Sequence, residues 1–217
     1  MGSDGDKMKK VIVRGPALSR SGYGEHARFV LRALRGNPDL FDVHLLNTNW
    51  GRTGWIYEDN EERRWFDQLL RKTSEYINSG GQFDVSIQVT IPNEWEKLAP
   101  VNIGVTAGIE TTKVSPQWIE KSMLMDKIIT ISEHSKNVYK DTTCQAQNAE
   151  TGEVVQDFRC ETPIEVVHYP VRDYEPADLD LNLDYDFNFL TIAQISPRKN
   201  VHNLIKWFVE EFKNEEV

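Results

Sequence analysis

Apolar and polar residues are arranged in two patterns along this 217-residue chain. Short apolar runs are separated by longer segments in which apolar residues recur every three or four positions, the spacing of one helical face. The short runs predict strands at 11–13, 41–46, 84–89, 101–106, 126–131, 164–167 and 187–193. The longer segments predict amphipathic helices from 27 to about 36 and over 61–77, 116–125, 133–140 and 201–212.

Strands and helices therefore alternate through most of the chain, a pattern typical of a parallel sheet covered on both faces. The expected fold is α/β, with a Rossmann-like parallel sheet and helices on both of its faces. The segment Cys144–Cys160 interrupts this pattern, and its turn at 149–152 predicts a small inserted β-hairpin. We interpret the two cysteines as ordinary thiols, and a disulfide between them stays open for an oxidising compartment.

The expected organisation has four parts. Residues 1–9 are interpreted as a cloning remnant or a disordered lead-in, and residues 10–172 as the first domain. Residues 173–186 are acidic and are interpreted as a solvated linker rather than a calcium site, because no glycine occupies the turn position that a calcium loop needs. Residues 187–217 hold one strand and one helix, which cannot bury a core of their own.

Composition narrows the range of partners. The net charge of -9 and the pI near 5.1 argue against a nucleic-acid partner, which would require a concentrated basic face. No apolar run reaches the length of a membrane span, and no apolar leader follows the first residue, so the expected location is the cytoplasm. Cysteine and histidine spacing predicts no metal site.

The first candidate site is the loop between the first strand and the first helix, Arg14–His26. Gly22 and Gly24 permit positive φ and close approach of a ligand, and the following helix directs free N–H groups at the loop. The pattern is Gly-x-Gly without the third glycine of a dinucleotide loop and without the Gly-Lys-Ser/Thr of a Walker loop. Two interpretations stay open: a capped βα turn, or an anion-binding loop, which the flanking Arg14 and Arg20 favour.

A second loop, Asn47–Tyr57, carries Trp50 and Trp55 among glycines. Tryptophans in such a loop either pack beneath it or stack on a sugar or a base.

Five segments together resemble the GT-B glycosyltransferases of family 4. They keep the family's order and spacing along nearly the whole chain, and they are 21–28, 104–111, 125–135, 166–171 and 192–200. The resemblance implies two Rossmann-like domains facing each other across a cleft, with residues 10–172 as the acceptor-side domain and residues 187–217 as the first βα unit of a truncated donor-binding domain. It also implies transfer of a sugar, with retention of configuration, from a nucleotide-diphospho-sugar to an unidentified acceptor, without a bound metal.

Residue by residue, the resemblance assigns two groups. Arg198 and Lys199 match the basic pair that neutralises the leaving diphosphate. Glu110 lies where many relatives have an acceptor-side histidine. These three residues form the catalytic group. An exposed loop carboxylate is the alternative interpretation of Glu110. The substrate-binding group comprises Ser21, Gly22, Tyr23, Gly24, Glu25, Gly108, Thr111 and Ser132.

The resemblance also indicates what these 217 residues lack. Val217 precedes the point at which relatives carry a Glu-x7-Glu element that holds the ribose and the sugar, so we expect little turnover from the chain alone. Two other functions stay open: a non-enzymatic glycan- or nucleotide-binding module, and a half-enzyme completed by a second polypeptide. A flavodoxin-like nucleotide binder is disfavoured, because it would not need Arg198 and Lys199. Trp207, Phe208 and Phe212 in the last segment predict self-association.

Overall fold

The computed structural model describes residues 8–147, 151–171, 173–193 and 195–213. The chain divides into two units, Met1–Val171 and Arg172–Val217. The expected lead-in falls largely outside the described residues, as do Asn148–Glu150 in the expected hairpin turn and Gln194.

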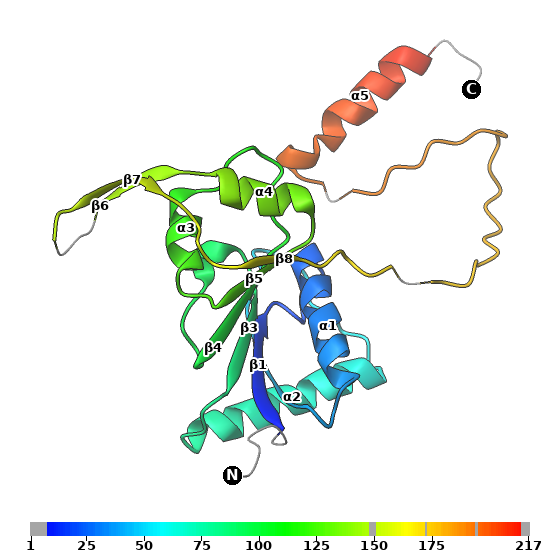
Figure 1. Ribbon diagram of the computed structural model, residues 1–217. Coiled ribbons are helices and arrows are strands. Elements are labelled where there is room, and N and C mark those ends of the chain that lie inside the picture. The colour runs from blue at the N-terminus through cyan, green and yellow to red at the C-terminus, as the bar shows by residue number, and fades with distance from the viewer. Residues whose placement is uncertain (1–7, 148–150, 172, 194, 214–217) are drawn as a thin grey trace. The chain divides into compact units, whose positions relative to one another are not determined.

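A six-stranded parallel sheet forms the centre of the first unit, in the order β2-β1-β3-β4-β5-β8 (Figure 1). Each strand expected in this unit forms within two residues of its predicted bounds. The strands are β1 (Lys9–Gly15), β2 (Phe41–Asn47), β3 (Val85–Val89), β4 (Val101–Val105), β5 (Lys127–Thr130) and β8 (Ile164–Val166). The helices between them are α1 (Gly22–Arg35), α2 (Glu61–Asn78), α3 (Pro116–Ser122) and α4 (Glu133–Asp141). The predicted Rossmann-like α/β fold is confirmed.

The strand register assigns the two faces of the sheet. Val11 pairs with Val43 and with Val85, so these side chains share one face. That face packs on α1 and α2 in a core that includes Leu31 and Phe66. The opposite face presents Ile128 and Ile164, which pair across β5 and β8 and pack with residues of α3 and α4. Helices therefore cover both faces.

The centre of the second face is covered by a loop that follows the short 3-10 helix η1 (Pro92–Glu94). Gln88 donates to the Glu96 carbonyl at 2.6 Å and accepts from the Glu96 amide at 3.1 Å. Asn102 Oδ1 accepts the Leu98 amide at 2.9 Å. The polar side chains of β3 and β4 thus form hydrogen bonds with backbone groups of the loop that covers them. Their alternation with apolar residues would by itself be typical of a strand with one face exposed to solvent.

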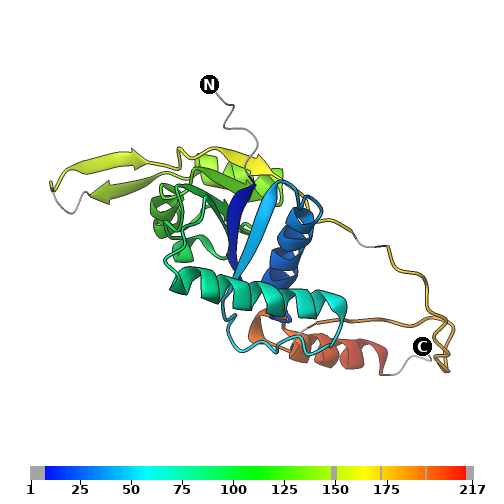
Figure 2. The same ribbon diagram turned by 90° about the horizontal axis from the view of Figure 1, so that it is seen from below.

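The predicted hairpin is also confirmed. It consists of β6 (Cys144–Gln147) and β7 (Val154–Phe158), paired antiparallel as a separate two-stranded sheet. Both views show it projecting from the body of the first unit (Figures 1 and 2). Cys144 and Cys160, at its base, are free thiols.

The second unit differs from the expectation. It contains the 3-10 helix η2 (Pro197–Lys199) and α5 (Val201–Phe212), but 187–193 forms no strand in its described residues, so that prediction is wrong. A strand needs a neighbour to complete its backbone hydrogen bonds, and the described part of this unit supplies none. Phe189 instead packs on the rings of Phe208 and Phe212, with centroids 5.1 and 5.5 Å away.

Candidate functional site

The candidate site lies at the carboxyl edge of the parallel sheet. The chain runs from β1 outward to β2 and then returns past β1 to β3, so the strand order reverses between β1 and β3. In open α/β sheets a crevice forms outside the strand ends at such a reversal, and ligands bind there. The loops after β1, β3 and β4 all begin at this edge.

The first turn of α1 presents unpaired backbone amides at this edge. Ser21 caps the helix, with its Oγ accepting the Gly24 amide at 3.0 Å. The first intrahelical bond runs from the Glu25 amide to the Ser21 carbonyl at 3.0 Å, so the amides of Gly22 and Tyr23 have no intrahelical acceptor. The capped-turn interpretation is therefore confirmed, and it does not exclude an anion, because free N–H groups at a helix N-terminus attract one.

Gly22 and Gly24 do not adopt positive φ, contrary to the expectation, because both lie in the helix. Among the described residues, the glycines with positive φ are Gly51, Gly80, Gly108 and Gly152. Gly24 is required for close packing instead, because a Cβ there would lie 2.1 Å from the Ser19 carbonyl oxygen. A Cβ on Gly22 would meet no atom within 4 Å. The space beside Gly22 is thus open at the point where the free amides begin.

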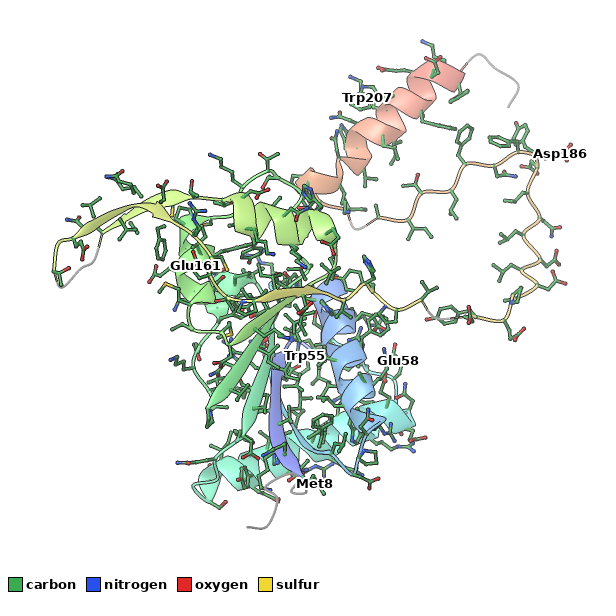
Figure 3. The ribbon with its side chains drawn as sticks, viewed as in Figure 1. Met8, Trp55, Glu58, Glu161, Asp186 and Trp207 are labelled. Carbon is green, nitrogen blue, oxygen red and sulfur yellow. The ribbon has the colours of Figure 1, made fainter. Side chains whose placement is uncertain are left out.

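Tyr23 connects α1 to two other loops. Its hydroxyl lies 2.9 Å from Thr106 Oγ1 and accepts the Ala107 amide at 3.2 Å. Its ring stacks on Trp50, with centroids 4.3 Å apart. Burial raises the pKa of Tyr23, against the lowering effect of its hydrogen bond with Thr106. Trp50 therefore packs within the protein, whereas Trp55 in the same loop keeps 40% of its surface exposed (labelled in Figure 3).

A second helix N-terminus lies at the same edge. Ser132, which the resemblance placed in the substrate-binding group, caps α4 and accepts the Ser135 amide at 3.1 Å. Gly108 has φ of +88°, and a Cβ there would lie 2.0 Å from Ser135 Oγ. Only glycine fits this position without strain, so the loop after β4 is held against the first turn of α4.

Glu110 and Thr111 lie on the exposed part of that loop. The Thr111 hydroxyl donates to the Lys113 carbonyl at 2.9 Å, which orders the loop. Burial raises the pKa of Tyr23, and the charges of Glu94 and Glu110 add to this more weakly.

Three charged residues near the first loop are held by the protein itself. Arg14 donates to the Glu94 carbonyl at 2.7 Å, and Arg20 pairs with Glu58 at 2.7 Å. Glu25 accepts hydrogen bonds from Arg28 and Arg32 at 2.7 and 2.8 Å, and these outweigh burial and lower its pKa. The cations that favoured an anion site thus bind protein atoms, and the free backbone amides are the stronger argument for one.

His26 ends the first candidate loop, but no role was predicted for it, because a lone histidine beside a helical segment gives no functional signal. It is 7% exposed, its Nδ1 has no partner in the described structure, and its ring meets the edge of Tyr169 at 4.8 Å. Burial lowers its pKa from 6.5 to about 4. His26 is therefore neutral at pH 7.

This shift predicts a pH dependence of stability. Because the folded-state pKa of His26 lies below its unfolded value, the free energy of unfolding is greatest above pH 6.5 and falls as pH decreases toward 4. Replacing His26 by Phe, which keeps a ring against Tyr169, should reduce the loss between pH 7 and pH 5 by about 2 kcal/mol. Urea denaturation of both proteins at the two pH values measures it. An unchanged loss in the variant would contradict the assignment.

The remaining predicted residues, Arg198 and Lys199, belong to the second unit. They form the 3-10 turn η2 before α5, and both are exposed. Asn200, directly after them, has φ of +52°. This turn presents two cations to solvent.

No family model, curated protein or solved structure matches this chain. The described residues contain no group of three or more His, Cys, Asp or Glu side chains arranged to hold a metal ion. Among the described helices, none has both the length and the apolar character required to cross a membrane.

Proposed function

We propose that the chain is a glycosyltransferase of the GT-B family 4 type, and that its first unit is the acceptor-side half. In this proposal the sugar moves from a nucleotide-diphospho-sugar to the acceptor with retention of configuration and without a metal. One observation carries the proposal: two serine-capped helix N-termini, those of α1 and α4, lie at the carboxyl edge of one parallel sheet. Helix N-termini with free amides are suited to phosphate oxygens.

The residues have distinct roles in this proposal. The amides of Gly22 and Tyr23 bind a phosphate of the donor, while Glu110 binds an acceptor hydroxyl from the loop after β4. Arg198 and Lys199 offset the charge that develops on the leaving diphosphate. Gly108 and Ser132 hold the α4 turn and its loop in place, which fixes the position of Glu110.

A binding module without turnover is the second candidate function. Such a module would bind its ligand through the free amides of the α1 turn alone, without a catalytic cation. A half-enzyme completed by a second polypeptide is distinguished from both by activity that depends on that polypeptide.

Titration calorimetry with uridine and guanosine diphosphate sugars, paired with an assay of sugar transfer and donor hydrolysis, tests the proposal. We expect binding of at least one of these donors and little turnover by the 217 residues alone. Binding of glycans without any nucleotide sugar would favour the module, and absence of all binding would overturn the proposal.

Gly22→Ala should separate binding from folding. Its methyl group enters open space beside the free amides, so donor affinity should fall about tenfold while the free energy of unfolding changes by less than about 1 kcal/mol. The matched control is Gly36→Ala at the opposite end of α1, where the nearest atom to an added Cβ is 3.4 Å away. Equal affinities of the two variants would exclude the α1 turn as the phosphate site.

A further inference from the structure

The projecting hairpin has two different edges. β7 is flanked or occupied by charged residues, namely Glu153, Asp157 and Arg159, whereas the segment 142–147 that contains β6 has no charge and no proline. The pairing of the two strands also contains a β-bulge between the pairs Cys144–Phe158 and Ala146–Val155. Between these pairs β7 has two residues and β6 has one, so the bulge lies in β7. Charges and bulges are the features that protect an edge strand from pairing with another chain. β7 has both, and β6 has neither.

The free edge of β6 is also uncovered. In the two-stranded sheet β7 is its sole neighbour, and the described residues supply no backbone hydrogen bond to β6 from outside the hairpin. A groove of about 570 Å³ separates one face of the hairpin, with Val155 and Phe158 of β7 beside the four β6 residues, from Pro116, Gln117 and Glu120 of α3. The hairpin is therefore not packed tightly on α3. A hairpin of two strands is marginally stable by itself, and a third strand would satisfy its open backbone groups.

We propose that this edge pairs with the same edge of a second copy of the chain. Two β6 strands related by a two-fold axis run antiparallel, which forms a four-stranded sheet in the order β7-β6-β6-β7. The charge distribution favours a second copy, because the uncharged segment 142–147 faces itself without repulsion while Glu153 and Asp157 stay on the outer strands. The net charge of -9 on each copy opposes association, so the dimer forms reversibly with concentration.

Two exposed glutamines provide a matched pair of variants. Gln145 on β6 and Gln156 on β7 lie side by side, with Gln145 Nε2 donating to Gln156 Oε1 at 3.4 Å. Gln145→Lys and Gln147→Lys place like charges near the two-fold axis, whereas Gln156→Lys adds the same charge one strand further out. At least one of the β6 variants should weaken the dimer about fivefold or more, and the β7 variant should not.

The experiment is sedimentation equilibrium of the full chain between micromolar and near-millimolar concentration. We expect a mass that rises from 25.1 kDa toward twice that value and amide hydrogen exchange that slows at 144–147 as the mass rises. A mass that stays monomeric throughout would overturn the proposal. So would a dimer that both β6 variants leave intact, because another surface, such as the apolar side of α5, would then mediate association.

Discussion

Replacing Gly24 by Ala should destabilise the first unit by about 2–3 kcal/mol, although alanine is the better helix former. The added Cβ would lie 2.1 Å from the Ser19 carbonyl oxygen and 3.0 Å from the Pro16 carbonyl oxygen. Both contacts are with backbone, so relief requires a shift of the whole α1 turn relative to the loop. Urea unfolding followed by circular dichroism measures the loss.

The control for this variant is Gly22→Ala, two residues away in the same turn. The two substitutions have the same chemistry and the same gain in helix propensity, but the added methyl at Gly22 meets no atom within 4 Å. We therefore expect a large loss for Gly24 and almost none for Gly22. Similar losses for the two variants would show that the Ser19 contact does not determine the position of the turn.

Local chemistry explains which parts of the fold the sequence predicts. Apolar periodicity located the strands and helices of the first unit. Two of these helices begin after a serine, Ser21 or Ser132, because a serine side chain satisfies an N-terminal amide. The segment 187–193 has the apolar run of a buried strand, but strand formation depends on a neighbour that local sequence cannot supply.

The candidate site was only partly predictable for the same reason. The sequence identifies Gly22 and Gly24 as positions that permit positive φ, but neither uses it: Gly24 is needed for close contact, and positive φ occurs instead at Gly108. The contact of Tyr23 with Thr106 joins residues 83 positions apart, and that of His26 with Tyr169 spans most of the first unit. Pairings of this kind follow from the strand order, and no local spacing encodes them.

Arg28 holds the first loop through two of its backbone carbonyls. It is 8% exposed, and its guanidinium donates to the carbonyls of Ala17 and Ser19 at 2.7 and 2.9 Å as well as to Glu25. Arg28→Met keeps the apolar stem of the side chain but removes the guanidinium, which leaves these two carbonyls without their donor. Because two buried carbonyl acceptors lose their donor, we expect a loss of about 3 kcal/mol in the free energy of unfolding; the part-buried pair with Glu25 adds little, since Glu25 keeps Arg32.

Two further variants test the cause of this loss. Arg35→Met on the same helix removes an exposed guanidinium that pairs with Glu61, and it should cost less than about 1 kcal/mol. Arg28→Lys restores the charge but not the planar fork that reaches two carbonyls and a carboxylate together, so it should recover only part of the stability. Full recovery by lysine would mean that charge alone holds the loop. Partial recovery, with donor affinity reduced in proportion, would mean that the geometry of the guanidinium positions Ser19 and Ser21, and through them the free amides of α1.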